Sequence, residues 1–131
     1  ALQGATTRNL QPANVARSAV EGLLASIEFC LEQISGQGID VGRVIMVGGG
    51  ARSEAVRRIA PAILGVPVHV PTPAEYVAIG AARQASWALS QADAPPAWTF
   101  GVTASYTADP TPEVLDRYRV AQSLTLGQRP A

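Results

Sequence analysis

Three consecutive glycines follow a short apolar run and offer the clearest candidate for ligand chemistry in the sequence. The run covers residues 44–47, V-I-M-V, and the glycines occupy positions 48–50. An apolar run without polar alternation is typical of a strand that is buried on both faces within a parallel sheet. Glycine has no Cβ, so a ligand can approach its backbone closely. A helix beginning near Ser53 and Glu54 would add free backbone N–H groups for phosphate or ribose oxygens.

This glycine turn matches neither of two common phosphate-binding fingerprints. The dinucleotide fingerprint G-x-G-x-x-G needs a different glycine spacing, with its last glycine where Ser53 stands. A P-loop would need Gly-Lys-Ser/Thr after the first glycines, and none follows. The residues alone therefore leave two interpretations open: a contact with a nucleotide, or a tight strand-to-helix turn without a ligand.

Three segments, in this order and spacing, resemble motifs of the FGGY carbohydrate kinases. Residues 44–53, V-I-M-V-G-G-G-A-R-S, are similar to the adenosine-contacting motif of that family. Upstream, residues 4–7 together with 14–22 resemble its second signature, and downstream residues 75–85 resemble the helix that closes its C-terminal domain. The resemblance covers about residues 1–98. Details such as P-P-A-W after that helix are most similar to the bacterial xylulokinases within the family.

The resemblance implies a nucleotide-binding role for the glycine turn. Enzymes of this family transfer a phosphoryl group from ATP, bound with Mg²⁺, to a sugar hydroxyl. Carried over by motif position, Gly49, Gly50 and Ala51 would border the ribose, α-phosphate and adenine. Glu54, on the first turn beyond, would lie near the adenine, where some family members carry a side-chain amide. The family's phosphate loop and proton-accepting aspartate belong to its N-terminal lobe, so we assign neither a catalytic residue nor a magnesium ligand to this chain.

Hydrophobic periodicity predicts an α/β arrangement of helix, strand, helix, strand and helix. The expected elements are a helix from Pro12 to the glycines at 36 and 38, a strand at 44–47, a helix at about 53–64, a strand at 66–70 and a helix ending near Ser90. The helix that ends near Ser90 is expected to begin with a capping box at residues 72–75, with Pro73 in the first helical position. Pro67 predicts that the second strand lies at a sheet edge. The family resemblance implies that these two short parallel strands are part of the C-terminal lobe of an actin-like, ribonuclease-H-like fold, whose remaining strands and N-terminal lobe precede residue 1.

Two parts of the chain have different expected roles. Residues 1–90 would form the C-terminal portion of the family's C-terminal domain, and residues 91–131 a mostly irregular, extended tail with a short helix at about 112–122. The small residues 80–82 are expected to pack their helix tightly against the sheet. The strand at 44–47 has only one partner strand, so we expect another polypeptide, the rest of the kinase or a second copy, to cover its other edge.

Composition narrows the class of protein. The 131 residues fit one domain at most, and a formal net charge of zero gives no indication of nucleic acid or of an anionic membrane. The single cysteine, Cys30, fits a reducing compartment and lies at a helix position expected to be buried. The start of the chain lacks a signal-peptide pattern, and no apolar run approaches the roughly 20 residues that span a bilayer. We therefore expect a soluble, cytoplasmic protein.

Three hypotheses about function remain at this point. The first is the ATP-binding portion of a xylulokinase, inactive by itself. The second is another FGGY kinase, acting on glycerol, gluconate or ribulose, since the residues that contact the sugar are not recognisable here. The third is a non-catalytic module whose apolar helices serve assembly or interaction.

Overall fold

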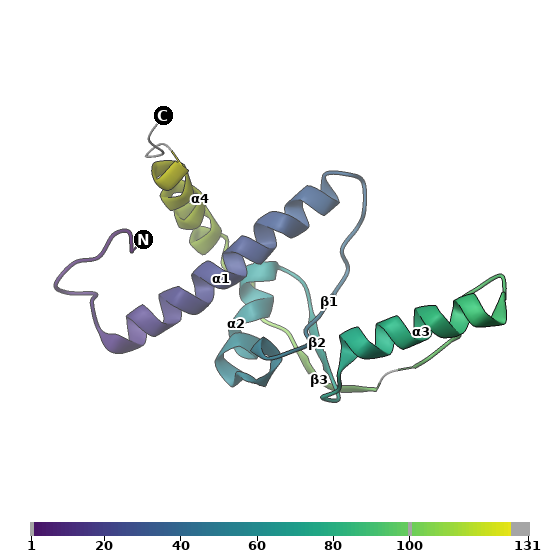
Figure 1. Cartoon of the computed structure of the whole chain (residues 1–131). Helices are drawn as coiled ribbons and strands as arrows, with labels where there is room; N and C mark the ends of the chain where they lie inside the picture. Colours follow the sequence, from purple (N-terminus) through teal and green to yellow (C-terminus); the bar gives the residue numbers. More distant parts are fainter. Residues whose placement is uncertain (1, 100, 127–131) are drawn as a thin grey trace.

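The computed structural model describes residues 2–99 and 101–126. Its elements are α1 (Pro12–Ser35), β1 (Val44–Ile45), the 3-10 turn η1 (Gly50–Arg52), α2 (Glu54–Leu64), β2 (Val68–Pro71), α3 (Tyr76–Ser90), β3 (Val102–Tyr106) and α4 (Pro112–Leu126). In Figure 1, α1 crosses α2, α4 lies beyond α1, and α3 extends away from the sheet. None of the helices in this described part is long and apolar enough to cross a membrane.

The two predicted strands pair in parallel, which confirms that part of the expected fold. Val44 lies opposite Val68 and Ile45 opposite His69. The N–H of Val44 donates to the carbonyl of Pro67 and that of Met46 to the carbonyl of His69, both at 2.9 Å. The first strand is shorter than residues 44–47, because Gly48 turns the chain away with a φ of 82°.

A third strand corrects two of the sequence expectations. β3 pairs antiparallel with β2, with Val68 opposite Tyr106, and gives the order β1-β2-β3. In the described part of residues 91–131, a strand therefore stands where an irregular tail was expected, and the helix runs from Pro112 to Leu126 instead of ending near residue 122. The edge position expected for the second strand is also wrong. Pro67 precedes the first residue paired with β3, so its missing N–H interrupts no ladder bond to that strand.

The core lies between α1, α2 and β2. Its buried members are Leu24, Ala25, Ala60, Ile63, Leu64 and Val68. Helix α4 packs against this cluster through partly buried apolar side chains, and its Arg119 pairs with Glu32 of α1. The start of α4 is also attached to α2, because the N–H of Thr111 donates to the carbonyl of Ala62 at 2.9 Å. Residues 101–126 are thus part of the same folded body.

Helix α3 begins and packs differently from the prediction. It starts at Tyr76, and Glu75 is its N-cap residue without a side-chain capping bond, so the capping box at residues 72–75 is wrong. The sheet explains this, since the N–H of Thr72 donates to the carbonyl of Gly101 and its hydroxyl lies 3.2 Å from that of Thr103. No residue of α3 is buried, so its small residues do not pack against this sheet.

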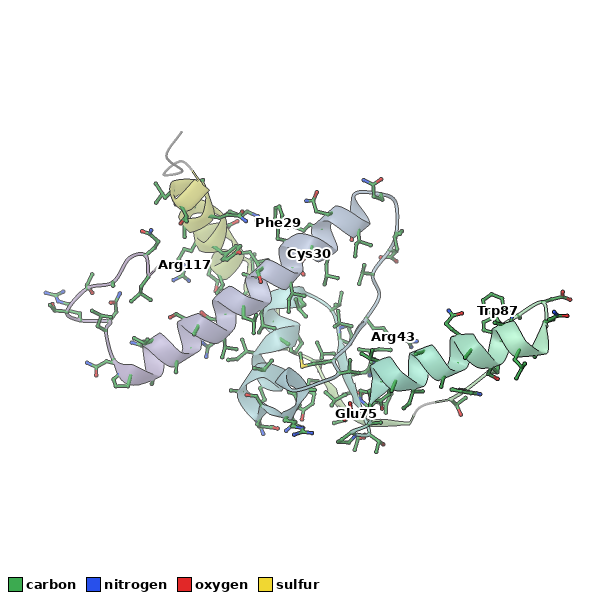
Figure 2. All side chains as sticks on the ribbon, viewed as in Figure 1. Phe29, Cys30, Arg43, Glu75, Trp87 and Arg117 are labelled. Carbon is green, nitrogen blue, oxygen red and sulfur yellow. The ribbon has the colours of Figure 1, made fainter. Side chains whose placement is uncertain are left out.

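The chain that follows α3 runs back along it instead. Figure 2 shows Trp87 far out on α3, where its indole N–H donates to the carbonyl of Ala92 at 2.6 Å. The Nε of Arg83 donates to the carbonyl of Pro96 at 2.8 Å. Helix and return segment therefore form a hairpin that projects from the folded body.

The expected burial of Cys30 is wrong as well. Cys30 is exposed, beside the exposed Phe29 on α1 (Figure 2). Helix α1 turns Leu24 and Ala25 into the core, and Cys30 lies off the stripe that they define. Several large apolar residues of the same helix remain exposed: Val15, Leu23, Ile27, Phe29 and Ile34.

Strand β1 has a free outer edge, from which we expect self-association of residues 1–131. Among the described strands only β2 pairs with it, and Ile45 is 55% exposed. An uncovered apolar edge is a template for pairing with another chain, and a lysine on such an edge opposes this pairing. Light scattering after size exclusion should show oligomers at concentrations where Ile45→Lys is mainly monomeric. A wild-type chain that stays a folded monomer would contradict this prediction.

Candidate functional site

A cavity of about 430 Å³ lies between the glycine turn and the loop that leads into α3. One wall comes from the end of β1 and the turn after it, and the other from the end of β2 and residues 73–76. Its lining residues are Met46, Val47, Gly48, Gly49, Ala51, Arg52, Val70, Pro71, Pro73, Ala74, Glu75 and Tyr76. Both walls follow parallel strands, whose carboxyl ends meet at the same edge of a sheet.

The candidate residues are distributed unevenly around this cavity. Gly49 and Ala51 line it, while Gly50 and Glu54 are not among its lining residues. Gly50 is the first residue of η1, directly between these two lining positions. The structure thus brings two of the four candidates to one concave surface and places the other two on the adjoining turn and helix.

Only one of the three consecutive glycines is required by the backbone. Gly48 has a φ of 82°, a conformation that residues with a side chain rarely adopt. Gly49 has ordinary helical angles, φ −62° and ψ −40°. A Cβ added at Gly49 or at Gly50 would meet no atom within 4 Å. Neither of these two glycines is therefore explained by local conformation or by crowding within the described residues.

The cavity carries one cationic and one anionic side chain. Arg52 comes from the glycine turn and Glu75 from the start of α3. Figure 2 shows Glu75 at the junction between the sheet and α3. The side chain of Glu75 makes no capping hydrogen bond, so helix capping does not account for its place in the wall. The cavity thus combines apolar side chains, exposed turn backbone and both signs of charge.

Helix α2 begins directly after the glycine turn, as the sequence predicts. The N–H of Val56 donates to the hydroxyl of Ser53 at 3.4 Å, so Ser53 is the N-cap residue. Glu54 follows in the first turn, where a negative charge is favoured by the helix dipole. The turn is closed by backbone bonds from Arg52 to Gly49 and from Ser53 to Gly50, each 3.1 Å.

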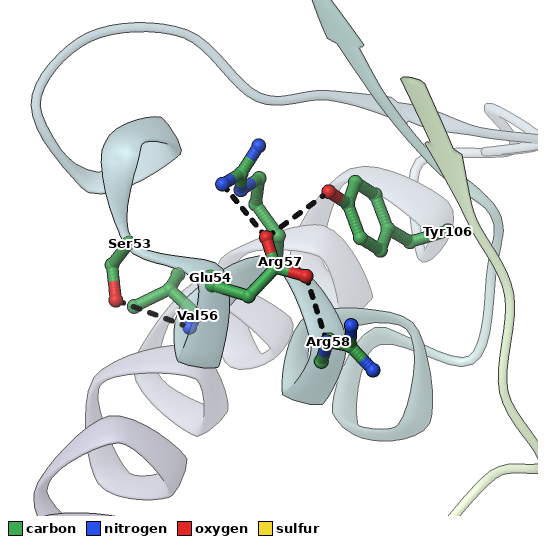
Figure 3. Close-up of polar contacts among 6 residues, drawn as sticks. All are labelled: Ser53, Glu54, Val56, Arg57, Arg58 and Tyr106. Carbon is green, nitrogen blue, oxygen red and sulfur yellow. Dashed lines mark hydrogen bonds and ion pairs between the residues drawn. The ribbon is translucent and has the colours of Figure 1, made fainter.

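The carboxylate of Glu54 is held by three neighbouring side chains (Figure 3). Its Oε1 accepts from the Nε of Arg58 and its Oε2 pairs with Nη2 of Arg57, both at 2.7 Å. The hydroxyl of Tyr106, from β3, donates to Oε2 at 3.4 Å. The hydrogen bond from Arg58, with the charges of both arginines, lowers the pKa of Glu54 below its ordinary value. Glu54 is therefore charged at neutral pH and already engaged.

Sequence reasoning missed part of this site. It did not place the end of β2 and residues 73–74 beside the glycine turn, and it did not bring Tyr106 to Glu54. A signal for the first was present, because two parallel strands deliver the residues after them to the same sheet edge. No sequence signal placed Tyr106 beside Glu54, because the strand of Tyr106 lies more than 30 residues beyond its partner strand, in an Ala/Pro/Thr-rich segment. Among the described residues, no three His, Cys, Asp or Glu side chains are grouped as metal ligands would be.

Comparison with known proteins identifies the family. Residues 3–89 match the C-terminal domain of the FGGY family of carbohydrate kinases. The chain belongs to this family. The sequence resemblance is thereby confirmed, and the FGGY match ends before β3 and α4.

The relatives of this FGGY chain include several xylulose kinases. It is 36% identical over 75 residues to the xylulose kinase of Streptomyces rubiginosus and 34% identical over 76 residues to that of Streptomyces coelicolor. These matches cover 57% and 58% of this chain, and the chain spans only 15% of the length of either relative.

Solved structures extend the likeness to nearly the whole chain. The xylulose kinase of Bifidobacterium adolescentis matches with a TM-score of 0.77 and 48% identity, over 92% of this chain and 24% of that one. The ligand-bound xylulose kinase of Lactobacillus acidophilus matches with a TM-score of 0.64 and 19% identity, over 92% and 25%. The FGGY chain therefore has part of the actin-like ATPase fold, which confirms the expected fold class.

Proposed function

We propose that this FGGY chain is the nucleotide-binding portion of a xylulokinase, which converts ATP and D-xylulose to ADP and D-xylulose 5-phosphate. The observation that carries the proposal is the pair Gly49 and Gly50, which neither the backbone angles nor crowding within the described residues explains. A ligand that must approach the turn backbone accounts for both. The likeness to xylulose kinases of three organisms supports the choice of sugar.

In this proposal the cavity beside the glycine turn receives part of the ATP molecule. Its size of about 430 Å³ lies within the range of about 300–1,000 Å³ that is usual for ligand pockets. Apolar residues such as Met46 and Val70 suit a purine face, and the turn backbone at Gly49, Gly50 and Ala51 suits the ribose and α-phosphate. Glu54 lies beside the adenine without accepting a hydrogen bond from its amino group, since two arginines already occupy the carboxylate oxygens.

ATP supplies the phosphoryl group, and the residues of this chain bind and orient it. Arg52 lies in the cavity wall, and its positively charged guanidinium would bind an anionic phosphate more favourably than it would bind an apolar part of the ligand. We place the magnesium ligands and the residue that accepts the proton of the sugar hydroxyl outside this chain. Magnesium then reaches the site on the phosphates of the nucleotide.

The proposal also assigns the parts of the chain and its surroundings. Residues 1–90 are the C-terminal portion of the family's C-terminal domain, and residues 91–131 are a tail that returns to it through β3 and α4. The remainder of the kinase, or a second copy, covers the free edge of β1 at residues 44–47. We propose the cytoplasm as its location, which the single cysteine of the sequence favours.

A chimera tests the nucleotide role directly. The matching segment of the Bifidobacterium adolescentis xylulose kinase is replaced by residues 1–131, and phosphorylation of D-xylulose is followed at increasing ATP concentration. We expect saturation by ATP and turnover in the ordinary enzyme range of roughly 1–1,000 per second. The control is the parent enzyme from which the matching segment has been deleted and not replaced.

A folded chimera that neither binds ATP nor turns over D-xylulose would refute the nucleotide role. The sugar needs a separate test, because the parent enzyme supplies the sugar site of the chimera. We expect the complete polypeptide that contains this chain to prefer D-xylulose over glycerol, gluconate and ribulose. A preference for one of those three would refute the xylulokinase assignment while leaving the nucleotide role intact.

A further inference from the structure

Tyr106 connects the last strand of the sheet to the helix that follows the glycine turn. It ends β3, which lies outside residues 3–89, the part that matches the family's C-terminal domain. Its partner in the ladder is Val68, which is fully buried. The half-buried side chain of Tyr106 faces α2, and Figure 3 shows its ring beside the first turn of that helix.

Two side chains of α2 meet this tyrosine. The guanidinium carbon of Arg57 lies 5.7 Å from the centre of the ring, within the range of a cation–π contact. The tyrosine hydroxyl donates to Oε2 of Glu54 at 3.4 Å, and the same oxygen pairs with Arg57 at 2.7 Å. We call Glu54, Arg57 and Tyr106 the clamp. Its three members contact one another, so each is held by the other two.

The clamp acts on the residues that precede it. Glu54 follows the N-cap Ser53, and the N–H of Arg57 donates to the carbonyl of Ser53 at 3.1 Å. Ser53 in turn donates to the carbonyl of Gly50 at 3.1 Å. A continuous series of backbone bonds thus leads from the clamped helical turn to the glycine turn. Displacing the first turn of α2 would displace the wall of the cavity.

We propose that Tyr106 is a positioning residue for nucleotide binding, which it supports by holding the first turn of α2, and with it the glycine turn, against β3. The inference rests on the proposed function of the glycine turn. It gives the segment after the family domain a defined role in the nucleotide site. Tyr106 itself is not among the residues that line the cavity, so its effect reaches the nucleotide through Glu54 and Arg57.

The test uses the chimeric kinase with Tyr106→Leu, Tyr106→Phe and, as a matched control, Ser105→Ala. Ser105 lies on the same strand and faces the opposite side of the sheet, where its hydroxyl is 2.7 Å from Nδ1 of His69. For Tyr106→Leu we expect the KM for ATP to rise about fivefold, as loss of a cation–π contact worth about 1 kcal/mol would produce. The KM for the sugar should change by less than about twofold in every variant. The KM for ATP should also change by less than about twofold in Tyr106→Phe, because phenylalanine keeps the ring over Arg57.

Amide hydrogen exchange separates this inference from the proposed function. In Tyr106→Leu, exchange of the amides of residues 50–54 should quicken, while Ser105→Ala should leave it unchanged. Faster exchange together with the selective rise in KM for ATP supports the role of Tyr106. Unchanged exchange, or equal rises in both KM values, overturns it. If the unmodified chimera fails to use ATP, the proposed function has failed and the inference, which rests on it, is overturned with it.

Discussion

Residues 1–131 alone are expected to transfer no phosphoryl group from ATP to D-xylulose. Phosphoryl transfer needs a residue that positions the attacking hydroxyl, metal ions on the phosphates and two lobes that close around the substrates. Among the described residues no cluster of potential metal ligands exists, and the chain spans 24% of the Bifidobacterium adolescentis xylulose kinase. The chain therefore presents one wall of a site whose chemistry we place elsewhere.

The measurement is a coupled assay of ADP formation with D-xylulose, ATP and Mg²⁺, with the chimeric kinase as the positive control. We expect the isolated chain to remain at the rate of the reaction without protein. Turnover by the purified chain at roughly 1–1,000 per second, the ordinary enzyme range, would show that it carries a complete catalytic site.

Replacing either of the two unexplained glycines is expected to weaken nucleotide binding strongly. Gly49→Val and Gly50→Val each place a branched side chain at the point where the turn backbone would meet the ligand. In the chimeric kinase we expect the KM for ATP to rise about 10- to 100-fold, equivalent to roughly 1.4–2.8 kcal/mol, with little change in the KM for the sugar. An added Cβ has open space at both positions in the described structure, so a failure to fold is not expected.

Gly42→Val is the matched control for these variants. Gly42 is also exposed, has no positive φ and would have no atom within 4 Å of an added Cβ, but it lies outside the cavity. Its KM for ATP should be unchanged. If folded Gly49→Val and Gly50→Val enzymes respond to ATP like the unmodified chimera, the glycine turn does not contact the nucleotide.

Local signals in the sequence were sufficient for the elements that surround the turn. Pro12 begins α1, Ser53 caps α2, and each of the two apolar runs contains a strand. Each of these features depends on residues close together in the chain, such as a proline without an N–H at a helix start or a hydroxyl three residues before the amide it accepts from. The family was equally recognisable, because its motifs are contiguous segments.

The predictions that failed concerned features that depend on contacts between distant segments. Thr72 and Glu75 have the spacing of a capping box, but the pairing of Thr72 with residues of the third strand keeps it in the sheet. Cys30 has an apolar setting in the sequence, yet α1 turns a neighbouring stripe into the core. In both cases the local pattern permitted two outcomes, and packing selected the one that the pattern did not favour.

The sequence by itself determined the glycine turn, its place between a strand and a helix, and the family to which the chain belongs. The tertiary structure alone decided which side chains share the cavity and which hold the turn. Glu75 reaches the cavity because two parallel strands end at one sheet edge. Tyr106 reaches Glu54 because β3 pairs with β2 across 31 to 38 residues of chain, from the pair Pro71–Val102 to the pair Val68–Tyr106. Strand pairing at such separations depends on the packing of the whole sheet and core, because the sequence near each strand does not specify its partner.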